Sequence, residues 1–366
     1  MSFFDKCKVK ILPESIEMKV ITDADYFSSK YLQYISNSKL KLINPQEGGS
    51  PQLFKDGLKS DYDSSLAFGN AIHCLLLQPD DFYLSDYQFK PSAKQGVFWD
   101  YLIKFRKEGL SIQDSIDKAS DKANYYKGKL TQKLLRKSFE AGFKYYLDAT
   151  KTDLLELKDG KEPIIVTPRL HDEITGCINA IKENSEIMDE LSLQNLSNSK
   201  IFRNEEALFA DIQVILPDGK IITLPFKGKL DSYSIDPDNK EIILNDLKTT
   251  GKFIQYFMGD YVDRLDENGK FIEKMFLNGS FQKYHYYRQM GIYMLLLQLY
   301  TKSLGYTDYT YKANMLVVES QAPYNSRKYF VNNSYIKEGL KEFKELICRV
   351  AYHTIYGFDI ELNEDE

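Results

Sequence analysis

Two acidic residues and a lysine stand close together in the sequence, in a pattern that could bind a divalent cation beside an anionic group. Asp231 lies in the first of two predicted strands, and Asp246 and Lys248 end the second, which begins at Glu241. The polar turn Asp236–Lys240 separates the two strands. Side chains alternate along a strand, so Asp246 and Lys248 share one face, and pairing of the strands brings Asp231 to the same place. We therefore expect two carboxylates that hold a hard cation, with a positive charge next to them.

The apolar run Ile242-Ile243-Leu244 bears on whether this segment is functional. On a surface hairpin the charged side chains would merely be solvated. The apolar run instead predicts a buried strand, and charged groups at the end of a buried strand are costly unless they have partners. This favours a functional site over a solvated hairpin.

The sequences on either side of these residues resemble the PD-(D/E)XK nuclease core. Residues 227–231 are K-G-K-L-D, and residues 246–250 are D-L-K-T-T. Together they resemble the RecE-like and RecB-type phage exonuclease branch, with Leu230 in the place where the nominal signature has proline. The resemblance implies an α/β, restriction-endonuclease-like fold in which helices flank a mixed central sheet.

The resemblance also implies roles for the residues of the motif. Asp231, Asp246 and the backbone carbonyl of Leu247 would hold Mg²⁺ or Mn²⁺. Lys248 would position the attacking water or help to deprotonate it, and would stabilise the pentacovalent phosphate.

A histidine lies within a predicted apolar helix, residues 64–78, which ends before Pro79. His73 stands one turn after Gly69. A single histidine on an apolar helix is ordinarily a core residue that hydrogen-bonds the backbone. The sequence G-N-A-I-H is similar to the G-x-x-x-H helix of the RecB/RecE branch, which implies that His73 is a further metal ligand.

Two glutamates precede the motif at the start of the predicted core sheet, which begins near Asn204. By resemblance, Glu206 would be a further metal ligand or would orient one. Glu205 is its rival, because the sequence does not determine which of the two side chains faces the site.

After Thr250 we expect an irregular, charged stretch to Asn278 and then a helix, residues 281–300. Gln289 and Tyr293 match the Q-x-x-x-Y of RecB-type nucleases, and residues four apart share one helical face. The resemblance implies that both side chains fix the lysine and the substrate. Near the N-terminus, apolar spacing predicts another helix over residues 26–43.

Residues 90–137 contain 12 Lys/Arg and 5 Asp/Glu, with aromatic residues interleaved. Basic charge with exposed rings is suited to a phosphate backbone and unpaired bases, although a solvated helical face is an equally good interpretation. The candidate DNA-binding residues are Lys94, Trp99, Lys104, Arg106, Lys107, Lys227 and Lys229.

Composition and motifs exclude several other classes. The four cysteines are scattered, which argues against a zinc site, a disulfide framework and an iron–sulfur cluster. There is no P-loop, so no ATP is expected, and no apolar run approaches the length of a membrane span. We expect a cytoplasmic protein with a single nuclease domain over residues 1–366: a helical part with a basic wall (22–200), a catalytic core (201–357) and a frayed acidic tail (358–366).

The resemblance implies a 5′→3′ exonuclease that acts on double-stranded DNA ends in recombination, works as a homo-oligomeric ring and supplies single strands to an annealing protein. Two alternatives stay open at this point. One is an endonuclease of defence or restriction type, and the other is a catalytically silent scaffold that binds DNA ends.

Overall fold

The computed structural model describes residues 2–21, 23–57, 64–78, 93–125, 130, 131, 133, 168–191, 199–251, 253–265, 267 and 270–364. The chain divides into two compact units. One comprises Met1–Asp63 together with Asn179–Glu366, and the other comprises Ser64–Ile178. The single nuclease domain expected over residues 1–366 stays a prediction.

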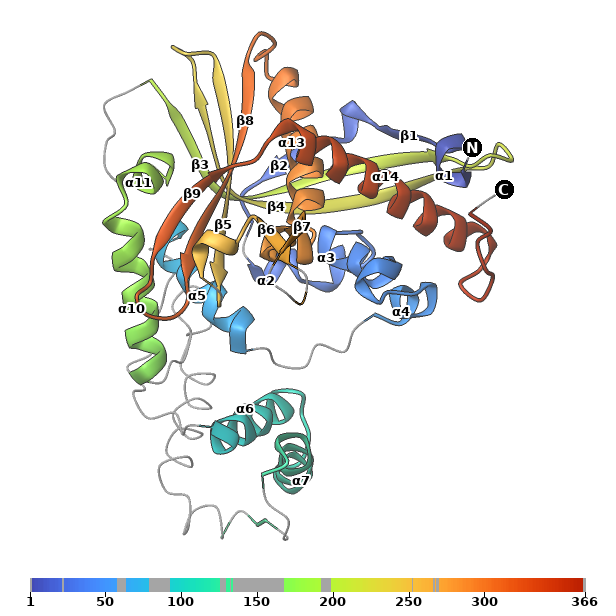
Figure 1. Ribbon diagram of the computed structural model, residues 1–366. Helices are drawn as coiled ribbons and strands as arrows, with labels where there is room; N and C mark the ends of the chain where they lie inside the picture. Colours follow the sequence, from blue (N-terminus) through green and yellow to red (C-terminus); the bar gives the residue numbers. More distant parts are fainter. Residues whose placement is uncertain are drawn as a thin grey trace. The chain divides into compact units, whose positions relative to one another are not determined.

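The larger unit is built on a seven-stranded mixed sheet (Figure 1). Its strands are β1 (Lys8–Ile11), β2 (Glu17–Lys19), β3 (Ile201–Ile215), β4 (Ile221–Asp236), β5 (Glu241–Thr250), β8 (Thr310–Glu319) and β9 (Ser326–Phe330). The order is β1-β3-β4-β5-β8-β9, and β2 also pairs with β3. β5 and β8 are parallel, whereas the other described pairs of this sheet are antiparallel.

The β3–β4–β5 meander forms because its turns carry the residues that such turns require. Gly219, between β3 and β4, has φ +88°, a conformation that glycine adopts without strain. Between β4 and β5, Asp236 Oδ1 accepts hydrogen bonds from the backbone N–H groups of Asp238 and Asn239. The apolar residues of β5 from Ile242 to Leu244 are buried, so the predicted buried strand is confirmed.

Helices cover both faces of this sheet. The helices of the larger unit are α1 (Phe3–Lys6), α2 (Asp23–Tyr26), α3 (Asn37–Leu40), α4 (Pro51–Asp56), α11 (Ser185–Leu191), α12 (Ser280–Lys283), α13 (Tyr286–Ser303) and α14 (Asn333–Tyr356). Short 3₁₀ turns lie between elements of this unit: η1 (Pro13–Ser15), η2 (Ser29–Tyr31), η3 (Lys41–Ile43), η4 (Pro45–Glu47) and η7 (Ile254–Tyr256). Successive β5 side chains point to opposite faces: Asn245 contacts Glu190 of α11, and Asp246 contacts Gln289 of α13. The expected α/β fold, a mixed sheet flanked by helices, is confirmed.

Helices α13 and α14 cross at two glycines. A Cβ added to Gly339 would lie 2.0 Å from the Tyr287 carbonyl oxygen, and one added to Gly291 would lie 2.9 Å from the Ile336 carbonyl oxygen. Glycine therefore lets the two backbones approach closely. This contact fixes α13, which carries Gln289, against α14.

The helix predicted over residues 26–43 is wrong. Only short helical segments, η2, α3 and η3, form there, because the backbone of Ile35 pairs with β4. Its N–H donates to the Pro225 carbonyl, and its carbonyl accepts from the Lys227 N–H. The stretch after Thr250 is not irregular throughout, since β6 (Asp260–Leu265) and β7 (Phe271–Leu277) form a separate hairpin.

Two further predictions need correction at the C-terminal side. The helix predicted over residues 281–300 is interrupted at His285, which has φ +52° between α12 and α13. The acidic tail was expected to be frayed, but it is held in place up to Glu364. The carboxylate of Glu364 lies 2.6 Å from Arg349 Nη2, and its backbone carbonyl accepts a hydrogen bond from the Phe3 N–H.

The smaller unit contains helices α5 (Ser64–Leu77), α6 (Ala93–Lys107) and α7 (Ile112–Ala123), and α10 (Pro168–Lys182) begins in it. α6 and α7 share an apolar core in which Phe98, Trp99 and Ile116 are fully buried. Among the described residues, no helix is long and apolar enough to cross a membrane.

Candidate active site

Asp246 and Lys248 face the same side of β5, as predicted, and form an ion pair. Lys248 Nζ lies 2.6 Å from Asp246 Oδ2, and both side chains are largely shielded from solvent. The other Asp246 oxygen, Oδ1, accepts a 2.7 Å hydrogen bond from Gln289 Nε2. The two oxygens of this carboxylate therefore have separate partners, which fixes the orientation of the group.

Asp231 joins the same site from β4. The β4–β5 ladder ends at the pair Ser232–Asn245, and beyond it Asp231 Oδ2 accepts a 2.7 Å hydrogen bond from the Leu247 N–H. The same oxygen lies 3.7 Å from Lys248 Nζ. The structure thus brings Asp231, Asp246 and Lys248 together.

The lysine ammonium contacts the three oxygens that were predicted to hold a metal. Besides Asp231 Oδ2 and Asp246 Oδ2, Lys248 Nζ donates to the Leu247 carbonyl oxygen at 3.2 Å. Carboxylate and carbonyl oxygens are the ligands that Mg²⁺ and Mn²⁺ prefer. The chemistry of this donor set therefore fits a hard divalent cation.

The surroundings of Lys248 keep it protonated. Burial alone would lower the pKa of this lysine, but the carboxylates of Asp246 and Asp231 outweigh that effect and raise the pKa above its usual range. The Tyr286 ring, whose centroid lies 5.5 Å from Nζ, adds a further favourable contact. The ammonium is thus suited to stabilising negative charge.

Tyr293, one turn after Gln289 on α13, packs against β4. Its ring lies over Gly228, where an added Cβ would stand 2.6 Å from Tyr293 Cε1. Burial, followed by the charges of Asp246 and Asp231, raises the pKa of the Tyr293 hydroxyl above its usual range. The glycine of K-G-K-L-D and the tyrosine of Q-x-x-x-Y therefore fit together.

We expect Gly228→Ala to destabilise the protein by about 1–3 kcal/mol, because the added methyl group overpacks the Tyr293 ring. Denaturant unfolding would measure this change. In a Tyr293→Ala background the cost of Gly228→Ala should largely disappear, as the clash is then removed. Gly251→Ala is a matched control, since its Cβ would meet nothing nearer than 3.9 Å. An equal cost in both backgrounds would contradict the assigned contact.

The structure favours Glu205 over Glu206 as the glutamate that faces the site. The β3–β4 register places Glu205 opposite Asp231, and oxygens of the two carboxylates lie within 4.8 Å of each other. Glu206 instead accepts a 2.8 Å hydrogen bond from the Tyr233 hydroxyl. The metal-ligand role predicted for Glu206 is therefore corrected. The φ of +55° at Glu205 is the local distortion that separates the two side chains.

Two of the predicted DNA-binding residues are buried in the protein. Trp99 is fully buried between α6 and α7, so its ring does not present a stacking surface. Lys227 is 7% exposed, and its ammonium donates to the Tyr26 carbonyl oxygen. Both predictions are wrong, because the protein encloses these two side chains. The local sequence around each residue did not reveal this burial.

The other predicted DNA-binding residues are differently placed. Lys229 lies 2.6 Å from Glu205, and its charge therefore contributes to the acidic site. On α6 the exposed basic residues are Lys94, Lys104, Arg106 and Lys107. Their contact with DNA stays a prediction.

His73 lies in the middle of α5, in the smaller unit, and is half-buried. Its assignment as a metal ligand stays a prediction from the sequence.

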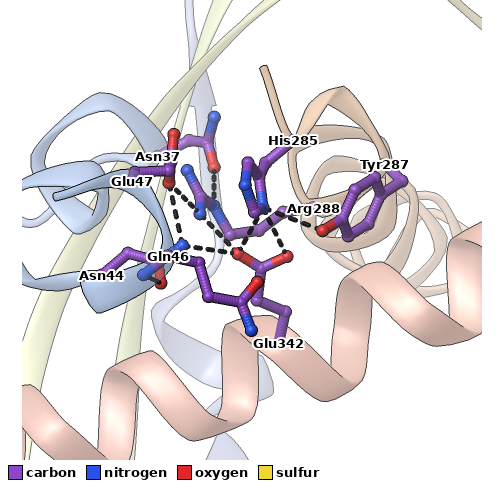
Figure 2. A network of polar contacts seen from close by, with 8 residues as sticks. All are labelled: Asn37, Asn44, Gln46, Glu47, His285, Tyr287, Arg288 and Glu342. Atoms are coloured by element: carbon purple, nitrogen blue, oxygen red, sulfur yellow. Dashed lines mark hydrogen bonds and ion pairs between the residues drawn. The ribbon is translucent and has the colours of Figure 1, made fainter. Parts of the chain in front are cut away.

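A second polar cluster, which the sequence did not reveal, holds the start of α13 (Figure 2). Arg288 is 1% exposed, and its Nη1 lies 2.6 Å from Glu47 Oε2 and 2.7 Å from Glu342 Oε1. His285 Nδ1 lies 2.8 Å from the same Glu342 oxygen, and Arg288 Nε donates to Asn37 Oδ1 at 2.9 Å. Glu47, His285 and Glu342 are close enough to hold a metal, but the guanidinium already supplies the cation. The cluster is therefore structural, and it positions the helix that carries Gln289.

The sheet and the D…D-x-K site define an α/β domain of the PD-(D/E)XK class. Residues 179–353 match the family described as a PDDEXK-like domain of unknown function (DUF3799). No curated protein matches the chain. A crystal structure from Eubacterium rectale, described as a "Putative exonuclease", is similar with a TM-score of 0.48 and 12% sequence identity, over 94% of this chain and 90% of that one. The family match and the site geometry support a nuclease.

Proposed function

We propose that this protein is a metal-dependent deoxyribonuclease of the RecE-like branch, a 5′→3′ exonuclease on linear double-stranded DNA. The observation that carries the proposal is the arrangement around Lys248. Its ammonium lies beside two carboxylates and a carbonyl oxygen on strands of a PDDEXK-like domain. Cation-binding oxygens next to a fixed positive charge are the groups that phosphodiester hydrolysis requires.

Each residue of the site has a role in this proposal. Asp231, Asp246 and the Leu247 carbonyl would hold Mg²⁺ or Mn²⁺, with Glu205 beside them. The bound cation would supply a Lewis acid for the phosphate and lower the pKa of an attacking water. Lys248 would stabilise the charge that develops on the phosphorane oxygens.

Gln289 would act through Asp246. Its hydrogen bond to Oδ1 leaves Oδ2 directed toward the ammonium, and would leave the same oxygen available to a cation. Tyr293 would keep α13 at a fixed distance from β4 through its contact with Gly228. Both are therefore positioning residues in this proposal.

The wider proposal follows the RecE-like resemblance. A homo-oligomeric ring would encircle the DNA and keep the enzyme bound to the end that it degrades. The reaction would take place in the host-cell cytoplasm during phage recombination. The single strand it leaves would pass to an annealing protein. An endonuclease of defence type would use the same site without needing a DNA end, so the two proposals differ in end dependence.

Digestion of one plasmid in circular and linearised forms tests the proposal. We expect the linear form to be degraded with Mg²⁺ or Mn²⁺, the circle to persist, and EDTA to stop the reaction. Linear DNA labelled at either the 5′ or the 3′ end would report the direction. Cutting of the circle would favour the endonuclease, and no cleavage with either metal would contradict both proposals.

A further inference from the structure

A pocket of about 500 Å³ lies just beyond the catalytic motif, at the carboxyl ends of β5 and β8. Its lining residues are Thr250, Gly251, Phe253, Tyr256, Glu319, Gln321 and Ala322. Its volume lies within the range of small-ligand sites, about 300–1,000 Å³. β5 and β8 are parallel, and the carboxyl ends of parallel strands are a common place for ligands.

The pocket lies on the same side of β5 as the catalytic residues. Thr250 is two residues after Lys248, which in turn is two residues after Asp246, so the three side chains form one row. The rise of a strand places Thr250 roughly 7 Å beyond Lys248. Stacked nucleotides advance about 3.4 Å along one strand of DNA, so this distance corresponds to one or two nucleotides. A nucleotide next to the cut phosphate would therefore reach the pocket.

Two aromatic rings in the pocket are exposed although the segment that carries them is fixed. Phe253 is 64% exposed and Tyr256 is 49% exposed. The backbone between them is held by a 2.7 Å hydrogen bond from the Ile254 N–H to Glu319 Oε1. Phe257, the next residue, is buried and stacks on Tyr286. Rings that are exposed on a fixed backbone offer a stacking surface at little entropic cost.

The charge of the pocket indicates which part of a nucleotide it would accept. Glu319 is 4% exposed, and its carboxylate accepts hydrogen bonds from the Ile254 N–H and from both nitrogens of Asn325. This buried negative charge disfavours a phosphate. It does not disfavour a planar base, whose N–H groups are donors and whose ring stacks on aromatic side chains.

We propose that this pocket binds an unstacked base of the DNA strand, one or two nucleotides from the phosphate that is cut, against the rings of Phe253 and Tyr256. The proposal rests on the nuclease function proposed above and assigns it a base-binding subsite. Unstacking at this position would separate the end of the strand from its neighbours and hold the adjacent phosphate near Lys248.

The experiment uses short DNA duplexes that carry 2-aminopurine at successive positions from the 5′ end, with the full-length protein in EDTA. We expect binding by the wild-type protein to change the 2-aminopurine fluorescence at one or two positions only. The double variant Phe253→Ala, Tyr256→Ala should lose that change and bind about 5- to 150-fold more weakly, which is the effect of losing one stacked base. Phe271→Ala is a matched control, because Phe271 is also exposed (54%) but does not line the pocket.

A duplex with an abasic nucleotide at the responding position completes the test. It should bind equally well to the wild-type protein and the double variant, because the base that distinguishes them is absent. A fluorescence change that is the same in wild type and double variant would overturn the pocket assignment, as would a lack of binding by the wild-type protein. The plasmid digestion separates the two proposals. If the protein cleaves DNA but gives either of these two binding results, the nuclease proposal is retained and only the pocket assignment is contradicted.

Discussion

Replacement of Lys248 by alanine should reduce the rate of DNA cleavage by roughly 10²–10³-fold or more, the effect of removing one group that stabilises transition-state charge. The ammonium is the positive charge that contacts Asp231, Asp246 and the Leu247 carbonyl. DNA binding should persist, because the basic side chains of α6, which are predicted to contact DNA, are not changed. Gel-based cleavage and fluorescence anisotropy of a labelled duplex would measure the two effects.

A second readout of the same variant does not depend on activity. The ammonium and a divalent cation compete for the same oxygens, so Mg²⁺ or Mn²⁺ should raise the Tm of Lys248→Ala more than that of the wild-type protein. Lys312→Ala is the matched control, because Lys312 pairs with Glu241 on the same sheet and is 51% exposed. If Lys248→Ala is fully active and metal raises its Tm no more than that of the wild-type protein, the assignment of this site is contradicted.

The largest expected effect on stability is that of Arg288→Met. This change leaves the carboxylates of Glu47 and Glu342 close together without their cation, and breaking a buried ion pair typically costs about 3–5 kcal/mol. Because Arg288 precedes Gln289, cleavage should also decrease at temperatures where the variant is still folded. Denaturant unfolding measures the first effect, and Arg264→Met serves as the control on an exposed ion pair with Glu273. A cost below about 1 kcal/mol would contradict the structural role of the cluster.

The same cluster predicts a dependence on pH. Burial alone would raise the pKa of Glu342, but the hydrogen bond from His285 and the charge of Arg288 outweigh it and lower the pKa below 4.5. A lowered pKa in the folded state stabilises the protein above the unfolded value, and this stabilisation is lost as the pH falls through the folded value. Glu342→Gln should therefore show a shallower loss of unfolding free energy below about pH 4.5 than the wild-type protein. Parallel pH profiles for the two proteins would contradict this assignment.

Local periodicity in the sequence was sufficient to predict the hairpin of Asp231, Asp246 and Lys248, whereas Gln289 was identified through the resemblance to RecB-type nucleases. Alternation along a strand places Asp246 and Lys248 on one face, and a spacing of four on a helix aligns Gln289 with Tyr293. Burial depends on what packs against a residue from elsewhere in the chain. For that reason Trp99 and Lys227 appeared to be surface groups although both are enclosed.

The choice between Glu205 and Glu206 also required the structure. A single left-handed residue in a strand, here Glu205 at φ +55°, changes which side chain faces the site, and nothing in the glutamate pair itself indicates it. The helix expected over residues 26–43 failed for a similar reason, because Ile35 forms its backbone hydrogen bonds with β4 and not within a helix.

The pairing of β1 and β2 with β3 has a consequence for any shortened form of this protein. Both strands come from the first 19 residues, and they cover the outer edge of the strand that carries Glu205. A fragment restricted to the family-matching region, residues 179–353, would leave the N–H and C=O groups of β3 without those partners. Open strand edges pair readily with other chains, so such a fragment would tend to self-associate through β3. By pairing with the edge of β3, the N-terminal strands thus protect the catalytic sheet from aggregation.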